Sequence, residues 1–151
     1  MIGRALDLET IRTVRAAAGT EKQRSILRAL AETGCRVAEV VGLKLRDCKP
    51  NAKTGIVAVK VTGKGNRERV AYLSMDAYRA ARAAYAGKVY LFEAGHGGAI
   101  STDYVRRVAG AAGFNAGAGR VSPHVFRHTW ATVQHAAGVP LAAVRRGRPR
   151  K

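Results

Sequence analysis

Acidic side chains are scarce in this sequence, and that scarcity is the first guide to its partner. The 151 residues include 10 Asp and Glu against 27 Lys and Arg, a formal net charge of +17. No acid follows Asp103, whereas basic residues continue to the last position, Lys151. An excess of this size repels itself and favours a polyanionic partner, so nucleic acid is expected. An anionic membrane is the weaker candidate, because no segment joins a basic face to a bulky apolar one.

Cysteine and long apolar runs are also scarce. Cys35 and Cys48 are too few for a disulfide framework and lack CxxC spacing, so we expect two small buried apolar residues. No apolar run reaches the roughly 20 residues that cross a bilayer. The N-terminal segment carries acids and has no continuous apolar stretch, unlike a signal peptide. We therefore expect a cytoplasmic protein without membrane contact, and 47% hydrophobic residues suffice for one domain with a core.

Helical periodicity and capping residues predict that most of the chain is helical. The predicted helices cover 7–18, 20–34, 37–43, 75–86, 101–114 and 122–137, and another is predicted from Pro140. The expected N-caps are Asp7, Thr20, Ser74, Ser101 and Ser122, while Gly34 and Gly138 are expected to end helices. In the first helix, Leu8, Ile11, Val14 and Arg15 are expected to share one stripe.

The periodicity changes near the middle of the chain. The segment 56–61 is rich in valine, and the segment 70–73 is expected to form the returning strand. Between them, Gly63-Lys64-Gly65-Asn66 predicts a tight turn with Lys64 at the tip of a β-hairpin. A short strand or extended segment over 89–92 precedes a glycine-rich loop. The prediction is an α+β fold, mostly helical, with a small antiparallel β-sheet packed on a helical core.

The first segment with candidate chemistry is TGCRVAEVVGLKLRD, residues 33–47. Arg36 stands at the start of a predicted helix, beside Glu39. A guanidinium can donate two parallel hydrogen bonds to a phosphate, and a helix N-terminus adds positive potential. Taken alone, Arg36 has the ordinary interpretation of a solvated arginine paired with Glu39.

The second segment is the hairpin VTGKGNRERV, residues 61–70. Its glycines allow the turn to approach a partner closely, and Lys64 projects from it. Lysine suits proton donation because its pKa shifts readily with its surroundings. The ordinary interpretation is an exposed hairpin tip, and the glycines lack the spacing of a phosphate-binding Walker loop.

The third segment is SPHVFRHTWATVQHAAG, residues 122–138. His124 and Arg127 are three residues apart, so they share a face near a helix N-terminus and can form an anion site. His128 and His135 continue along that side, and we expect both to pack or form hydrogen bonds inside the domain.

In this order, the segments TGCRVAEVVGLKLRD, GKGNRER and HVFRHTWAT resemble the catalytic domain of the tyrosine recombinases, the phage-integrase family. The resemblance extends from the LDLETI helix to about Val144, and it implies a catalytic domain over 1–144 followed by a basic tail over 145–151. It further implies double-stranded DNA as partner, with site-specific strand breakage and rejoining in DNA integration and recombination. Self-association on DNA is implied for the full-length protein.

The resemblance also implies a role for each site residue. Arg36 and Arg127 would bind the scissile phosphate, and His124 would donate a hydrogen bond to it and assist proton transfer. Lys64 would be the general acid for the departing 5′-hydroxyl, and Glu39 would support the first arginine. Because fixed positive groups can stabilise the charged transition state of phosphoryl transfer, no metal and no other cofactor are expected.

The resemblance stops before the nucleophile of the family. Family members continue past the HxxR helix with a His or Trp position and then the attacking tyrosine, whereas this sequence reads GVPLAAVRRGRPRK. The five tyrosines, Tyr72, Tyr78, Tyr85, Tyr90 and Tyr104, all precede that helix. The N-terminal DNA-clamping domain common in the family is also missing. We therefore expect a trimmed or naturally truncated form that does not cleave DNA through tyrosine by itself.

Other interpretations remain open. Arg145, Arg146 and Arg148 are expected to bind DNA, and Arg148-Pro149 resembles the AT-hook of the A·T minor groove, although a chance basic tail is the simpler interpretation. A catalytically dead DNA-binding remnant or regulator is an alternative to an active enzyme. His124 and His128 could hold zinc in a metal hydrolase. Against that, no HExxH motif is present, and Arg127 would repel a cation.

Overall fold

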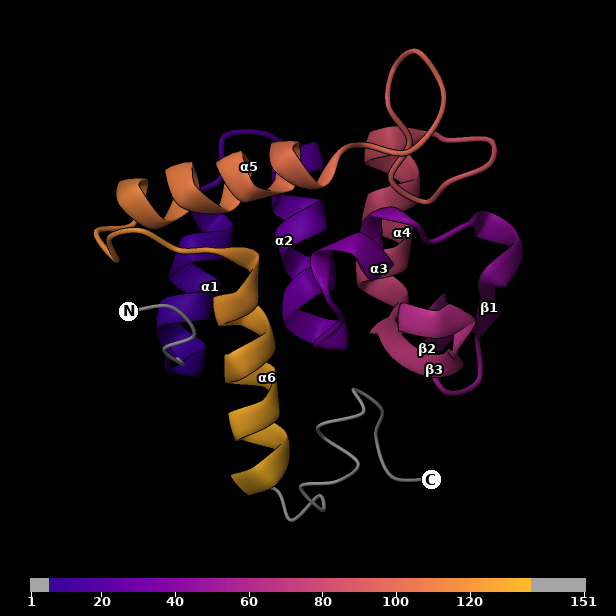
Figure 1. The fold of residues 1–151 in the computed structure, drawn as a ribbon, viewed down its shortest axis with the longest axis horizontal. Coiled ribbons are helices and arrows are strands. Elements are labelled where there is room, and N and C mark those ends of the chain that lie inside the picture. Colours follow the sequence, from indigo (N-terminus) through magenta and orange to yellow (C-terminus); the bar gives the residue numbers. More distant parts are fainter. Residues whose placement is uncertain (1–5, 137–151) are drawn as a thin grey trace.

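The computed structural model describes the backbone of residues 6–136 (Figure 1). The elements are α1 (Leu8–Ala16), α2 (Glu21–Thr33), α3 (Val37–Val41), η1 (Leu45–Asp47), β1 (Cys48–Asn51), β2 (Ile56–Thr62), η2 (Lys64–Asn66), β3 (Glu68–Ser74), α4 (Met75–Tyr85), α5 (Thr102–Asn115) and α6 (Pro123–Ala136). The predicted fold class is confirmed, because helices predominate and the sheet is small and antiparallel. The predicted helix from Pro140, the stop at Gly138 and the basic tail lie outside the described residues.

Capping side chains begin most helices where the sequence predicts. Asp7, Thr20, Ser74 and Ser101 each accept a hydrogen bond from the backbone N–H three residues further on, at 2.7–3.1 Å. These bonds satisfy N–H groups that have no partner within the helix. Of the stripe predicted for α1, Ile11 and Val14 are buried, whereas Leu8 at the first position of the helix is 49% exposed.

Ser122 is a correction to the capping scheme. Its Oγ is buried and has no hydrogen-bond partner within the described part of the chain. The N–H of Val125, a donor that a capping hydroxyl could have satisfied, instead donates to the Ser122 carbonyl at 3.0 Å. The helix still begins at Pro123, whose missing N–H and fixed φ suit the first helical position.

The sheet has the order β1-β2-β3, and the predicted hairpin is confirmed as β2 and β3. Val57, Val59 and Val61 turn toward the helices and are buried. The edge strand β1 was not predicted, because it contains Pro50 and little apolar alternation. Proline is tolerated on an edge strand, where its missing N–H breaks no ladder. Between β1 and β2, Asn51 Oδ1 accepts a hydrogen bond from the Lys53 N–H at 3.0 Å.

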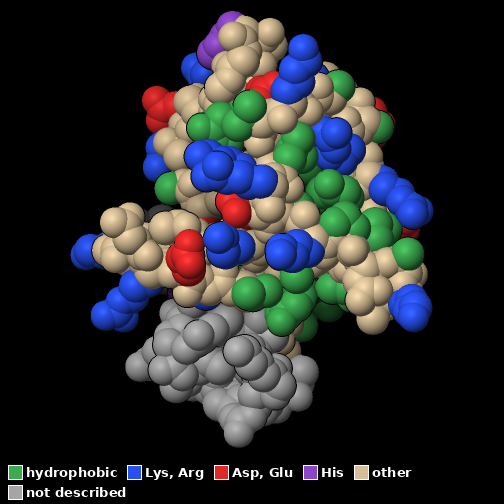
Figure 2. All heavy atoms as spheres, turned by 90° about the vertical axis from the view of Figure 1, so that its right-hand side faces the viewer, with side chains coloured by type: hydrophobic (Ala, Val, Ile, Leu, Met, Phe, Trp, Pro, Cys, Tyr) green, Lys and Arg blue, Asp and Glu red, His purple; other side chains and the backbone are tan. Residues whose placement is uncertain are grey.

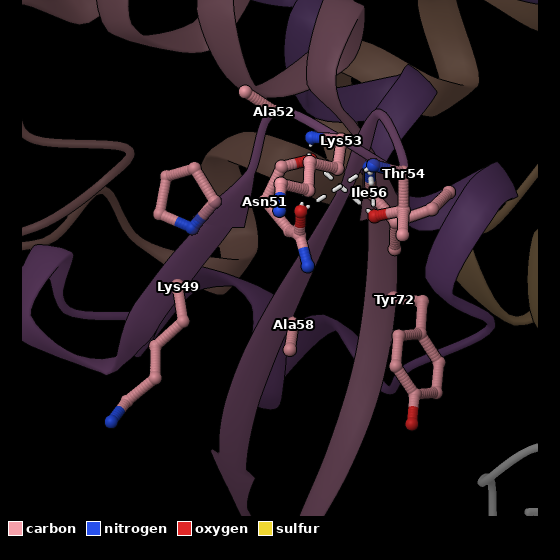
Figure 3. A pocket seen from close by; sticks show the side chains of 9 residues that line it. Lys49, Asn51, Ala52, Lys53, Thr54, Ile56, Ala58 and Tyr72 are labelled. Carbon is pink, nitrogen blue, oxygen red and sulfur yellow. Dashed lines mark hydrogen bonds between the residues drawn. The ribbon is translucent and has the colours of Figure 1, made fainter.

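The outer face of the sheet is open to solvent. Figure 3 shows the side chains of Lys49, Ala58 and Tyr72 on this face, in a shallow hollow of about 660 Å³. Seen from the sheet side, hydrophobic side chains are interspersed with many Lys and Arg side chains and fewer Asp and Glu (Figure 2). The sheet therefore buries one face only, as antiparallel sheets commonly do.

The central helix α2 organises the core. It packs against α4, α6 and β3, and Figure 1 shows it between α1 on one side and α4 on the other. Its buried side chains include Ile26, Leu27 and Leu30. Cys35 and Cys48 are both free and buried, as predicted. In the described residues, no helix has the length and apolarity needed to cross a membrane.

Helix α6 approaches the end of α2 at a glycine. Gly34 ends α2 in the left-handed region, with φ 66°, and its N–H donates to the Leu30 carbonyl at 3.1 Å. A Cβ at this position would lie 2.2 Å from Cδ2 of Trp130, a buried side chain of α6. Gly34 thus meets two requirements at once, the helix-ending turn and the close approach of α6.

This contact predicts that Gly34→Ala is strongly destabilising. A left-handed L residue costs about 1–2 kcal/mol, and overpacking against Trp130 adds about 1–3 kcal/mol. The matched control is Gly55→Ala, with φ 71° but no atom of the described chain within 4 Å of the added Cβ. Urea denaturation should show the larger loss of unfolding free energy for Gly34→Ala. Equal losses in the two variants would mean that the Trp130 contact imposes no constraint.

Candidate active site

Arg36 lies at the junction between α2 and α3. It is the N-cap residue of α3, two positions after the turn at Gly34. Its backbone N–H donates to Oε1 of Glu39 at 2.8 Å, while its side chain is 61% exposed. The guanidinium therefore extends into solvent from a backbone position that Glu39 holds in place.

The carboxylate of Glu39 is the buried centre of this region. It accepts hydrogen bonds from both terminal nitrogens of Arg69, at 2.5 and 2.8 Å, and lies 3.9 Å from the Arg36 guanidinium. Its side chain is 4% exposed and that of Arg69 is 10% exposed. Burial acts to raise the pKa of Glu39, but the hydrogen bonds from Arg69 and from the Arg36 backbone outweigh it, so the pKa lies below its ordinary value of 4.5. Glu39 stays ionised.

Arg69 is the residue that the sequence analysis missed. It lies opposite Val61 on β3, and its side chain shares the inward face with Ala71 and Leu73. A charged residue in phase with two buried apolar residues of a strand was the available signal, because alternate residues share a face. The expectation that Glu39 supports Arg36 therefore needs a refinement. Glu39 accepts a hydrogen bond from the Arg36 backbone N–H, but the guanidinium that binds its carboxylate in a bidentate manner is that of Arg69.

The hairpin brings Lys64 close to this pair. A Cβ on Gly63 would lie 2.9 Å from Oε2 of Glu39, so the hairpin end approaches the carboxylate because position 63 is a glycine. The Gly63 N–H donates to the Arg67 carbonyl at 2.8 Å and closes the turn. Lys64 follows in η2 and is exposed, as predicted for the tip. Within the described residues, no hydrogen bond or ion pair engages its ammonium group.

Arg127 joins α6 to the same place. Its Nη1 donates to the Gly34 carbonyl at 2.6 Å, two positions before Arg36. Burial lowers the pKa of Arg127, and repulsion by Arg36 lowers it further. Arginine remains charged in proteins despite such shifts. The repulsion shows that the two guanidiniums lie near enough to interact, although 91 positions separate them in the sequence.

His124 lies one helical turn before Arg127 and is exposed. The pKa of His124 is below its ordinary value of 6.5, first because the ring is partly desolvated. Nearby positive groups lower it further, namely His128, Arg127 and Arg36. His128 is exposed, with its ring centroid 4.6 Å from that of His124, so the prediction that it packs inside the domain is wrong. Its position on α6 places it beside His124 on the solvent side, one turn further on.

Some predicted site residues cannot be placed. Arg145, Arg146 and Arg148 lie outside the described residues, and so does the side chain of His135. In the part of the chain that is described, no group of three or more His, Cys, Asp or Glu side chains could hold a metal ion.

The arrangement suits an oxyanion. The end of α2, the start of α3 and the start of α6 together place Arg36, Arg127 and His124 around one region. The nearby carboxylate of Glu39 is engaged mainly by Arg69. One carboxylate cannot neutralise all of these guanidiniums, so the region keeps a net positive charge. A tetrahedral phosphate could accept hydrogen bonds from both of them.

Comparisons with known proteins identify the family of the chain. The sequence model of the phage integrase family matches residues 6–146. Tyrosine recombinase XerC of Bifidobacterium longum (strain DJO10A) is 32% identical over 151 residues, covering 86% of this chain and 40% of the relative. Tyrosine recombinase XerC of Corynebacterium glutamicum is 35% identical over 127 residues, covering 80% of this chain and 40% of the relative.

Solved structures show the same fold. XerH site-specific recombinase, in a pre-cleavage complex with its difH substrate, matches with a TM-score of 0.80 and 21% identity, covering 95% of this chain and 46% of that one. XerA recombinase matches with a TM-score of 0.77 and 25% identity, covering 96% of this chain and 54% of that one. The chain spans about 40% of the length of the two curated XerC relatives. The family match over residues 6–146 shows that the chain belongs to the phage integrase family of tyrosine recombinases.

Proposed function

We propose that this chain provides the phosphate-binding part of a site-specific DNA recombinase, acting on double-stranded DNA in the cytoplasm during DNA integration or recombination. The observation that carries the proposal is the convergence of Arg36, at the start of α3, with His124 and Arg127 of α6, while the nearby carboxylate of Glu39 is engaged by Arg69. The catalytic domain of this proposal covers residues 1–144, with a basic tail over 145–151.

The chemistry assigned to each residue follows from its charge and place. Arg36 and Arg127 bind the equatorial oxygens of the scissile phosphate and stabilise the charge that develops in the transition state. His124, whose lowered pKa keeps it mostly neutral at pH 7, donates a hydrogen bond to the phosphate and relays a proton. Lys64 protonates the departing 5′-oxygen from the hairpin tip. Glu39 positions Arg36 through its backbone N–H.

DNA as the partner is supported by charge and by the matched structures. The net charge of +17 is suited to neutralising phosphates. The matched structures include a lambda integrase dimer bound to a COC′ core site and a lambda integrase tetramer bound to a Holliday junction, at TM-scores of 0.75. These complexes support self-association on DNA for a full-length form of this protein. Basic residues of the tail, Arg145, Arg146 and Arg148, would add phosphate contacts.

The attacking tyrosine is the part of the chemistry that the described site does not supply. None of the five tyrosines lies on α3, α6 or η2. The hydroxyl of Tyr85 donates to the Lys22 carbonyl at 2.8 Å, and burial raises the pKa of this tyrosine. This placement favours, as the alternative function, a DNA-binding remnant or regulator without cleavage activity.

The proposed pairing of Arg36 and Arg127 on the scissile phosphate, here called the phosphate clamp, predicts weaker DNA binding when either arginine is removed. Arg36→Ala and Arg127→Ala should each lower affinity for a duplex and make the slope of log K against log salt shallower by about 0.9, because one phosphate contact is lost. Fluorescence anisotropy at several salt concentrations measures both quantities. Arg107→Ala, an exposed arginine on α5, is the control for loss of one charge. Affinity and slope equal to those of the control would refute the clamp.

The general-acid role predicts a separable effect of Lys64→Ala. Binding should change little, while cleavage by a form extended to carry the nucleophile of the family should slow by about 10²–10⁴-fold, the usual contribution of a general acid. A substrate with sulfur in place of the departing 5′-oxygen should restore the rate, since a thiolate leaves without protonation. Failure of this substrate to restore the rate would assign Lys64 a different role.

The placement of the tyrosines predicts that this 151-residue chain forms no covalent complex with DNA. A nicked suicide duplex carrying the cognate site, analysed on a denaturing gel, should show no shifted protein–DNA band, although the same duplex binds in a salt-sensitive manner. A covalent band would mean that one of the five tyrosines attacks, within one molecule or from another copy. Tyr→Phe variants would then identify it.

A further inference from the structure

A second concentration of arginine lies between α1 and the N-terminal half of α2. A pocket of about 270 Å³ lies there, lined by residues of α1 and α2 and by Ala80 of α4. Its polar lining consists of Arg12, Arg15, Arg24 and Arg28 together with Glu21 and Ser25. None of these residues belongs to the candidate active site, which lies at the opposite end of α2.

Two of the four arginines are held in place by acids. Arg24 pairs with Glu21, and its Nη1 also donates to a backbone carbonyl at 2.8 Å. Arg28 Nε donates to Oε2 of Glu32 at 2.9 Å. These contacts compensate two positive charges and make the α2 wall of the pocket rigid.

The other two arginines, both on α1, are uncompensated. Arg12 is exposed and Arg15 is half-buried, and neither forms an ion pair with an acid in the described residues. The pocket therefore retains two positive charges after its internal pairs are counted. Burial lowers the pKa of Arg15 and repulsion by Arg28 and Arg12 lowers it further, although attraction by Glu32 acts in the opposite direction.

Two buried polar atoms belonging to this lining lack partners. Arg15 Nε and Ser25 Oγ are both buried and have no hydrogen-bond partner in the described part of the protein. Ser25 is only 5% exposed. Buried donors without partners are rare in folded proteins, and a bound water or ion is one arrangement that satisfies them. Thus a guanidinium nitrogen and a hydroxyl, both from residues that line the same pocket, lack hydrogen-bond partners in the described residues.

We propose that this pocket binds a small doubly charged oxyanion, of which inorganic phosphate is the representative. The charge matches, because inorganic phosphate carries between one and two negative charges near neutral pH and a positively charged pocket favours the doubly charged form. The lining suits such an anion as well, since Arg12 and Arg15 contribute positive charge and Arg15 Nε and Ser25 Oγ have no other partner in the described residues. This site is independent of the DNA-binding function proposed above.

The size and depth of the pocket favour a free anion over a strand of DNA. Its volume lies just below the range of about 300–1,000 Å³ typical of drug-sized ligands. The hydroxyl of Ser25 is buried, and a backbone phosphodiester, flanked by sugars on both sides, would have to approach it from the surface.

Calorimetric titration of the 151-residue chain with inorganic phosphate, at constant ionic strength, tests the proposal. We expect saturable binding that weakens about tenfold or more in Ser25→Ala and in Arg12→Gln. Ser25→Ala removes only an unpartnered hydroxyl, so it should fold normally. Arg46→Gln removes an exposed arginine outside the pocket and should bind phosphate like the unaltered chain. Sulfate should compete with phosphate.

Phosphate could also occupy the clamp of the candidate active site, so the two sites must be separated. Arg36→Ala should leave the phosphate affinity of the α1–α2 pocket unchanged while weakening DNA binding. The proposal is overturned if phosphate does not bind, or if Ser25→Ala and Arg12→Gln bind it as tightly as Arg46→Gln. If phosphate does not bind and Arg12→Gln weakens duplex binding as much as Arg36→Ala does, the pocket is instead a contact for the DNA backbone.

Discussion

The buried pair between Glu39 and Arg69 is the interaction on which the rest of the site depends. It joins α3 to β3 through two parallel hydrogen bonds, and both side chains are almost fully removed from solvent. Removing either partner from such a pair leaves an uncompensated buried charge, which costs about 3–5 kcal/mol. The same carboxylate accepts the Arg36 N–H and is overlain by Gly63. One carboxylate thus holds the start of a helix, the backbone of Arg36 and the hairpin that carries Lys64.

The second link of the site runs through the end of α2. Gly34 turns the chain, admits the Trp130 ring and offers its carbonyl to Arg127. These contacts bring α6 to Gly34, two positions before Arg36. They explain why Arg36 and Arg127, 91 positions apart in the sequence, lie near enough to repel each other. The side chain of Arg127 and the backbone of Arg36 are therefore held in place before any anion binds. Preorganisation of this kind is what makes electrostatic stabilisation of a transition state effective.

Arginines in this protein differ in whether an acid compensates them. Arg69, Arg24 and Arg28 are each paired with a glutamate and serve the architecture. At the candidate active site and in the α1–α2 pocket, by contrast, positive charge remains after the local pairs are counted. With 27 basic and 10 acidic residues, most basic side chains cannot find an acidic partner within the chain. The uncompensated arginines are where anions are expected to bind.

Local patterns determined the parts of the structure that depend on neighbouring residues. Asp7, Thr20, Ser74 and Ser101 cap helices because a side-chain oxygen reaches an N–H three positions away. The hairpin follows from its alternating β-branched residues and its glycine turn. The three motifs carrying Arg36, Lys64 and Arg127 were identifiable in the same way. Their recognition as one family pattern needed only their order and spacing.

Tertiary structure alone decided the features that join distant segments. The partner of Glu39 could not be read from the sequence, because 30 positions separate it from Arg69 and the register of β3 brings them together. The edge strand β1 exists because β2 offers it a ladder, despite Pro50. Ser122 does not cap α6, and His128 faces solvent, because the way α6 docks sets the surroundings of both. Local propensity acts over a few residues, whereas burial and pairing depend on where the whole chain places its neighbours.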